Sequence, residues 1–233
     1  MAFTKRPDGR KFDETRKMEA KVGVVKNADG SAMFKFGDTI AIAAVYGPKP
    51  LHPQHLQDPQ KGLLRCNYDM LSFSVNERKR PGPSRRSQEI SKITEWALSN
   101  VVDLDNYPNS VVDVHISILQ ANASTRCAGI NAAAMALAHA GVSMKDLVSS
   151  VSIGKIDDKI VVDLIKEEED YEEGDGASDI PLAFLSKSGK ISLLQLDGKI
   201  EPDKLKEAIK TGKKACEEIY KLQEKTLKFI GDK

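Results

Sequence analysis

The sequence predicts an α+β protein with two related βαβ-type halves, in which mixed sheets pack against helices. Two observations support this class. Strand-like segments at residues 18–25 and 31–46 open the chain, and later segments carry apolar residues at helical spacing. The halves follow one another with no low-complexity spacer. We therefore expect a single domain over residues 1–233, with two separable domains as the alternative.

The first elements are predicted to be strands joined by tight turns. The sequence RPDGR at residues 6–10 is a turn signal. Residues 39–46, TIAIAAVY, form a nearly continuous apolar run, as expected for a strand buried on both faces. The proline-rich residues 48–59 predict a surface loop, and residues 63–75 return to strand patterning.

Two helices and a strand are expected next. Apolar residues recur three or four positions apart from about Ser87 to Val102, which predicts an amphipathic helix. Residues 111–120 alternate like a strand. The alanine-rich residues 125–140 predict a second helix, whose small side chains suit close packing on a sheet and whose end is signalled by Gly141.

The second half repeats this order of strands and then a helix. Its final segment is the longest periodic stretch of the chain, and Pro202 near its start is typical of a first helical turn. The predicted elements are a helical turn at 144–148, strand pairs at 148–153 with 159–164 and at 180–185 with 190–196, and a helix at about 201–229.

Composition excludes several classes of protein. The 233 residues include 35 Lys and Arg against 34 Asp and Glu, a net charge of +1, which argues against a protein that coats nucleic acid by bulk charge. The hydrophobic fraction of 40% suffices for a core. No apolar run approaches the roughly 18 residues of a membrane span, and no signal peptide is visible. The three cysteines lie far apart, which predicts reduced thiols in a cytoplasmic protein. Since no apolar run is long enough to span a bilayer, we also expect no membrane partner.

Although the net charge is close to zero, the sequence contains two local runs of opposite charge. Residues 78–86 read RKRPGPSRR, with five cations and no acid, and residues 167–173 read EEEDYEE, with six acids and no base. A solvated loop is the common interpretation of a single such run. The alternative is that the first run holds a polyanion and the second handles protons or a cation.

The junction at residues 120–126, QANASTR, is a candidate anion site. It joins a strand to the alanine-rich helix, and Ser124 and Thr125 are good N-cap residues. The unpaired N–H groups of a first helical turn, two hydroxyls and Arg126 would together suit phosphate. An ordinary capped helix with an exposed Arg is the alternative, and from spacing alone it is the commoner case.

A second cationic candidate is the pair Arg85 and Arg86, which we expect just before the helix that starts near Ser87. Guanidinium groups suit bidentate contacts with phosphates, and the neighbouring prolines stiffen the loop. An RNA or DNA backbone contact is therefore a reasonable interpretation, and a solvated loop is the alternative.

The acidic candidates are Asp170, Asp175 and Asp179, which lie between two apolar, strand-like runs. Asp179 directly precedes the run Ile180–Phe184 and so belongs at the mouth of a strand. Carboxylates that face a phosphate site can bind Mg²⁺ or give a proton to a leaving oxygen. A solvated acidic loop is the alternative for some of these residues.

A series of motifs resembles the RNase PH family of phosphorolytic exoribonucleases, over nearly the whole chain and in the same order. The first half carries RPDGRKFDETR, KNADGSAMFKFGDT, AVYGPK, ERKRPGPSRRSQEISK and ILQANASTR, and the second carries GKIDDKIVVDL, SDIPLAF and LLQLDG. Within the family, HPQHLQDP and ERKRPGPSRR are most similar to the catalytic RNase PH-like subunit of the archaeal exosome.

The resemblance implies an RNase PH fold and degradation of RNA from the 3′ end, with inorganic phosphate as co-substrate and nucleoside diphosphates as products. The reaction can also run in reverse and add 3′ tails. Implied partners are the 3′ end of single-stranded RNA, a sister RNase PH-like subunit in a hexameric ring and RNA-binding cap subunits. The resemblance assigns phosphate binding to Ser124, Thr125 and Arg126, RNA binding to Arg85 and Arg86, and catalysis to Asp170 and Asp179, with Asp179 as a candidate ligand of Mg²⁺.

The sequence departs from the family pattern at three places. Ser124 stands where glycine is common, and the acidic loop is longer, so Glu173 or Asp175 could replace Asp170 as the first carboxylate. Gln54 stands where relatives can carry a basic residue in the loop that lines the entry pore of the ring.

Two alternative functions follow. One is a non-catalytic RNA-binding ring subunit, which Ser124 and the long acidic loop would favour. The other is a stand-alone RNase PH that trims tRNA as a homohexamer.

Overall fold

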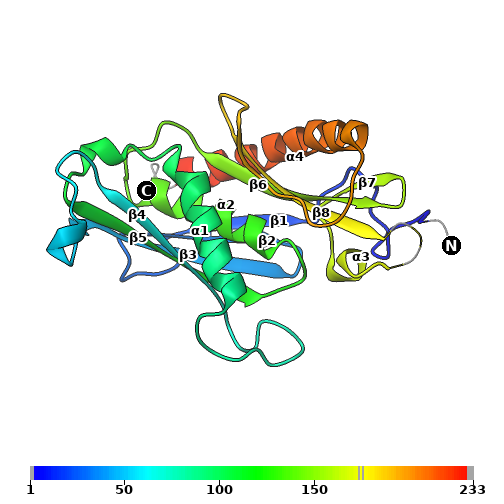
Figure 1. Ribbon diagram of the computed structural model, residues 1–233, viewed down its shortest axis with the longest axis horizontal. Helices are drawn as coiled ribbons and strands as arrows, with labels where there is room; N and C mark the ends of the chain where they lie inside the picture. The colour runs from blue at the N-terminus through cyan, green and yellow to red at the C-terminus, as the bar shows by residue number, and fades with distance from the viewer. Residues whose placement is uncertain (1–2, 173, 175, 230–233) are drawn as a thin grey trace.

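The computed structural model describes residues 3–172, 174 and 176–229. It contains two sheets and four α-helices within those residues (Figure 1). In chain order the elements are β1 (Met18–Val22), β2 (Gly30–Phe36), β3 (Thr39–Pro50), β4 (Leu63–Met70), α1 (Arg85–Ser99), β5 (Ser110–Gln120), α2 (Thr125–His139), β6 (Val148–Ile156), β7 (Lys159–Val162), α3 (Lys166–Glu169), β8 (Ala177–Leu185), β9 (Ile191–Leu194) and α4 (Pro202–Lys228).

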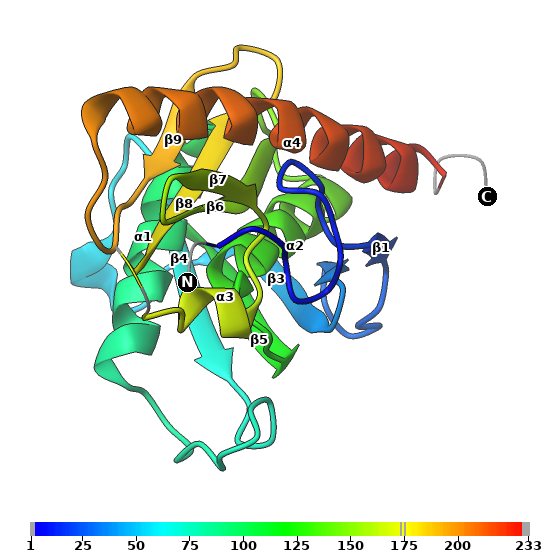
Figure 2. The same ribbon diagram turned by 90° about the vertical axis from the view of Figure 1, so that its right-hand side faces the viewer.

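The α+β class with mixed and packed layers is confirmed. The first sheet has the strand order β1-β2-β3-β5-β4, in which β4 and β5 run parallel and are connected through α1, and the other pairs are antiparallel. The second sheet has the order β7-β6-β8-β9 and is antiparallel throughout. Figure 2 shows the layers: α4 covers the second sheet, and α2 with α1 lies between the second sheet and the first.

Helix α2 is the centre of the fold. It packs against β2, β3 and β5 on one side and against β6 on the other, and one hydrophobic cluster extends through both halves around it. This position explains its composition, because a helix covered on all sides has no face left for polar side chains. Small side chains also permit close approach: a Cβ at Gly30 of β2 would lie 2.4 Å from the Ala136 carbonyl oxygen.

Three local expectations need correction. Residues 39–46 are buried on alternate positions only, because α2 covers one face of β3 and the residues on the other face stay half-buried. Residues 144–148 form no helical turn, since Met144 instead pairs as an isolated β-bridge with Val102. Strand β3 extends to Pro50, so the expected surface loop at 48–59 begins later and contains a short 3-10 helix at Gln54–Leu56.

Candidate active site

A cleft of about 860 Å³ lies where the two halves meet. It is bounded by the first turns of α1 and α2, the start of β8 and the short helix α3. Its lining combines residues that the sequence singled out with others that it did not. The former are Arg86, Ser124, Thr125, Arg126 and Asp179, together with Arg78, Lys79, Glu167 and Glu169 from the two charge runs, and the latter include Ser152 and Lys166.

The turn between β5 and α2 forms one wall of the cleft. Ala123 and Ser124 both have left-handed backbone conformations, with φ of 54° and 52°, which residues other than glycine rarely adopt. The Ser124 side chain makes no N-cap hydrogen bond to α2. Its hydroxyl lies 3.0 Å from Asp163 Oδ1 and 3.2 Å from the Leu164 carbonyl oxygen. The first N–H groups of α2 therefore have no side-chain cap from Ser124, and this end of the helix favours an anion.

Arg126 lies in the first turn of α2, and its side chain is only 19% exposed. Its guanidinium donates to Gln195 Oε1 and lies 3.5 Å from Glu89 Oε1. These neighbours hold the guanidinium against the cleft wall, where an anion would meet a cation already fixed in place. Thr125, beside it, is buried.

Helix α1 starts earlier than expected. Ser84 is the N-cap and exchanges hydrogen bonds with Ser87, so Arg85 and Arg86 belong to the first helical turn and not to the preceding loop. Cations at a helix N-terminus lie at the positive end of the helix dipole, which lowers the stability of the helix. Their presence there is therefore better explained by a function than by stability. Both residues are exposed, but successive helix residues point in different directions: Arg86 lines the cleft, whereas Arg85 is not among the lining residues.

The segment before α1 adds further cations to the cleft. Arg78 and Lys79 line it from the loop that follows β4. Partial burial, and to a smaller degree the Arg86 charge, lower the pKa of Lys79 from its usual value. The predicted basic run thus contributes three of its members to one cavity, namely Arg78, Lys79 and Arg86.

Asp179 faces these cations from the start of β8. The carboxylate accepts a hydrogen bond from Ser152 on β6, and the backbone of Asp179 pairs with Asp197. Burial raises the pKa of Asp179 to about 6, although the Ser152 hydrogen bond acts in the opposite direction. Glu169 raises it further and Arg126 lowers it. A carboxyl group that titrates near neutral pH can exchange a proton with a substrate.

The other acidic candidates are placed differently. Asp170 caps the C-terminal end of α3, where its exposed carboxylate pairs with Lys166 at 2.6 Å, and it is not among the cleft-lining residues. Its neighbour Glu169 does line the cleft. Glu173 and Asp175, the other candidates for the first carboxylate, lie outside the described residues. The acidic run thus pointed to this wall of the cleft, but the members that line it are Glu167 and Glu169 and not Asp170.

A metal site is not formed by the described residues alone. Among them, no group of three or more His, Cys, Asp or Glu side chains is placed to hold a metal ion. Mg²⁺ is commonly bound through one or two carboxylates with water and substrate phosphates, so Asp179 as a magnesium ligand stays a prediction.

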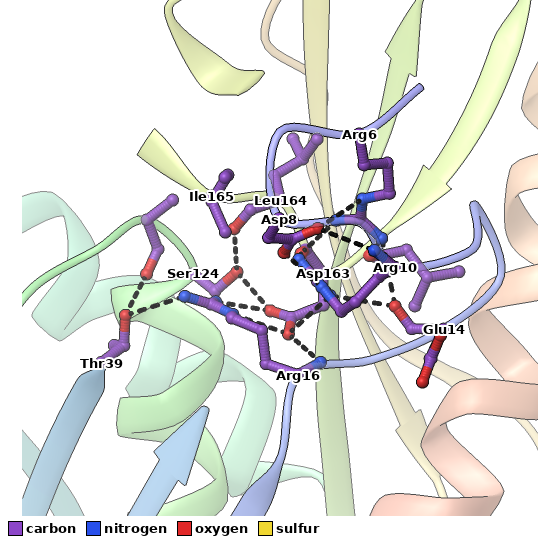
Figure 3. Close-up of polar contacts among 12 residues, drawn as sticks. Arg6, Asp8, Arg10, Glu14, Arg16, Thr39, Ser124, Asp163, Leu164 and Ile165 are labelled. Atoms are coloured by element: carbon purple, nitrogen blue, oxygen red, sulfur yellow. Dashed lines mark hydrogen bonds and ion pairs between the residues drawn. The ribbon is translucent and has the colours of Figure 1, made fainter. Parts of the chain in front are cut away.

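Behind the turn lies a polar cluster that no local sequence pattern predicts (Figure 3). Buried Asp163 follows β7, and Arg16 precedes β1, yet the two form an ion pair at 2.6 Å. Arg6 and Arg10 join the same region, Arg6 through a buried pair with Glu168 of α3. The motif RPDGRKFDETR thus ties the N-terminal segment to the second half of the protein.

Comparison with known proteins identifies the family. Family models for domain 1 and domain 2 of the 3′ exoribonuclease family of RNase PH match residues 14–143 and 146–215. The chain therefore belongs to the RNase PH family of 3′ exoribonucleases.

More particular similarity is to exosome components named Rrp41. The chain is 49% identical to Rrp41 of Methanopyrus kandleri, over 96% of this chain and 92% of the relative. It is 46% identical to Rrp41 of Archaeoglobus fulgidus, over 95% of this chain and 86% of the relative. Two solved structures share the fold at 24% identity. The structure of rice Rrp46 has a TM-score of 0.85, and the match covers 96% of this chain and 100% of the rice chain. A chain of the Archaeoglobus fulgidus exosome with RNA bound to the active site has a TM-score of 0.78, and the match covers 93% of this chain and 92% of that chain.

Within the part of the chain that the structure describes, no helix is both long enough and apolar enough to cross a membrane.

Proposed function

We propose that this protein is a phosphorolytic 3′-to-5′ exoribonuclease, the catalytic subunit of an archaeal-type exosome. The observation that carries the proposal is the cleft itself. There the start of α2 and the Arg126 guanidinium lie opposite Asp179, a carboxyl group whose pKa is raised to about 6. Such a site can hold an attacking phosphate on one side and protonate a leaving oxygen on the other.

In the proposed reaction, an oxygen of inorganic phosphate attacks the phosphorus that joins the last nucleotide to the RNA. A P–O bond forms, and the bond from that phosphorus to the 3′ oxygen of the preceding nucleotide breaks. Asp179 gives its proton to this departing oxygen. The products are a nucleoside diphosphate and an RNA shortened by one nucleotide, and the reverse reaction adds a nucleotide to a 3′ end.

The cleft residues then have distinct roles. Thr125, Arg126 and the backbone of Ser124 position inorganic phosphate, while Arg86 and Arg85 hold the last phosphodiesters of the RNA. A second carboxylate takes part in catalysis beside Asp179. The candidates are Asp170, which the sequence resemblance assigns, and Glu169, which lines the cleft. With no covalent enzyme intermediate, positioning and charge stabilisation must supply most of the rate enhancement.

We infer the assembly from the relatives. The proteins similar to this chain are named exosome components, which supports a hexameric ring with a sister RNase PH-like subunit, RNA-binding cap subunits and a cytoplasmic location. We also infer that the chain folds as one domain, since its core runs through both halves around α2.

Co-expression with the sister subunit, followed by an RNA trimming assay with and without phosphate, tests this proposal. Phosphate-dependent shortening supports it, and RNA binding without shortening favours the non-catalytic ring subunit. A native mass measurement of the purified chain separates the remaining alternative, since a homohexamer would indicate a stand-alone RNase PH.

A further inference from the structure

We propose that Arg16 and Asp163 form a positioning pair for the phosphate site, because together they hold the turn at residues 121–124 from the side opposite the cleft. The proposal rests on the proposed function, since it assigns a role relative to phosphate. Neither residue is among those that line the cleft, so each acts through the turn and not on the substrate.

Arg16 reaches the turn and Asp163 at the same time (Figure 3). Its Nη2 lies 2.6 Å from Asp163 Oδ1, and its Nε and backbone N–H donate to Asp163 Oδ2 at 2.8 and 2.9 Å. Its remaining nitrogen, Nη1, donates to the Asn122 carbonyl oxygen at 2.6 Å. A planar guanidinium can make both contacts at once, which a lysine ammonium could not do with the same geometry.

Asp163 holds the other end of the turn. Its Oδ1 accepts from the Ser124 hydroxyl at 3.0 Å, and Ser124 is one of the two residues in the left-handed conformation. Asp163 is itself left-handed, with φ of 56°, and fully buried. Backbone strain of this kind persists only where the surroundings fix it, and it is concentrated at functional sites.

Thr39 at the start of β3 completes the support. Its hydroxyl lies 2.9 and 2.8 Å from the carbonyl oxygens of Asn122 and Ala123, and accepts from the Asn122 N–H at 3.0 Å. The two carbonyl oxygens of the turn are therefore engaged by Arg16 and Thr39, away from the anion. Since carbonyl dipoles aimed at phosphate would repel it, the engagement of these two oxygens by Arg16 and Thr39 removes that repulsion from the phosphate site.

A purely structural role is the competing explanation, because the same N-terminal segment also carries the buried pair of Arg6 and Glu168. This pair provides a matched control for Arg16. Arg6 is as deeply buried and also spans the two halves, but its hydrogen bonds go to residues 11, 14, 162, 163 and 168 and none reaches the turn. For Asp163 the control is Asp113, a buried carboxylate paired with Arg65 on the first sheet.

The test compares Arg16→Lys and Asp163→Asn with the controls Arg6→Lys and Asp113→Asn, each in complex with the sister subunit. In Asp163→Asn the new amide N–H₂ would oppose the donors of Arg16, and the turn would lose its anchor. We expect kcat/KM for phosphate to fall about ten- to a hundredfold in the first two variants, with the KM for RNA within about twofold of the wild-type value. The controls can lose stability but should keep the wild-type kcat/KM for phosphate.

Phosphate binding is measured separately as the rise in Tm with inorganic phosphate, which requires no RNA cleavage. We expect this rise in the wild type and in the controls, and its loss in Arg16→Lys and Asp163→Asn. An unchanged phosphate response in these two variants, or an equal loss in the controls, would overturn the inference. If the Tm pattern is as expected but no RNA is shortened, the positioning role stands and the proposed phosphorolysis fails. If the wild type neither responds to phosphate nor shortens RNA, both fail.

Discussion

The hydroxyl of Ser152 on β6 donates a hydrogen bond to the carboxylate of Asp179 on the neighbouring strand β8. The bond stabilises the ionised carboxylate, whereas burial favours the protonated form and has the larger effect. The resulting pKa of about 6 is the property that permits Asp179 to act as a general acid near neutral pH.

Ser152→Ala should therefore shift the pH profile of phosphorolysis. If protonated Asp179 is the active form, kcat/KM falls as the pH rises through about 6 in the wild type. Loss of the hydrogen bond raises the pKa of Asp179, so this decline should move to higher pH, by about one unit for a charge-assisted bond. Ser150→Ala is the matched control, since its hydroxyl donates to the Leu182 carbonyl oxygen on the same strand pair. A profile unchanged in Ser152→Ala argues against the general acid role.

Arg126→Ala should remove most phosphate-dependent activity. The guanidinium is the cation at the start of α2, and removal of one such preorganised group typically costs a factor of about 10² to 10³. Arg126→Lys should recover part of the activity, because the charge returns without the planar fork. Steady-state kinetics at varied phosphate concentrations measure the effect. Full activity in Arg126→Ala would contradict the assignment.

Arg85 and Arg86 provide a matched pair for RNA binding, since they are adjacent in the first turn of α1 and only Arg86 lines the cleft. Arg86→Ala should weaken the binding of single-stranded RNA more than Arg85→Ala. It should also reduce the slope of log K against log salt concentration by about 0.7 for each RNA phosphate that the protein no longer neutralises. Binding is measured without phosphate, so that no RNA is degraded. Equal weakening of RNA binding in both variants would contradict this prediction, because position in the cleft would then make no difference to RNA binding by these two arginines.

Ser124 should tolerate glycine better than alanine. Its φ of 52° is unfavourable for any residue with a Cβ, and its hydroxyl compensates through the bonds to Asp163 and Leu164. Ser124→Gly loses the bonds but also the strain, so we expect a change in the free energy of unfolding below about 1 kcal/mol. Ser124→Ala keeps the strain without the bonds, and should cost about 1 to 2 kcal/mol. Urea unfolding curves distinguish these results, and an equal cost for both variants would show that backbone strain at this position is not significant.

The sequence predicted the elements whose signals are local. The helix expected at residues 125–140 is observed at Thr125–His139, and the one expected at 201–229 at Pro202–Lys228. The signals for them, alanine content and Gly141 for the first, apolar spacing and Pro202 for the second, lie in the segment itself or beside it. Arg85 and Arg86 were both misplaced by local reasoning, since the apolar stripe begins inside the helix and the Ser84 cap precedes it.

The residues that line the site were largely predictable from the sequence, but the buried residues behind them were not. Ser124, Thr125, Arg126, Arg86 and Asp179 line one cleft. The pair of Arg16 and Asp163 is 147 residues apart in sequence, and no local pattern signals that these residues meet. Asp170 and Glu169 are equally acidic neighbours, and only the direction of each side chain from α3 separates them.

The identity of the nucleotide released from the 3′ end of a single-stranded RNA decides whether the cleft carries out phosphorolysis. The wild-type chain in complex with its sister subunit is compared with Asp179→Asn, with and without inorganic phosphate. We predict nucleoside diphosphates as products, only when phosphate is present, and almost none from Asp179→Asn. Release of nucleoside monophosphates without phosphate, or undiminished release from Asp179→Asn, would contradict the proposed reaction.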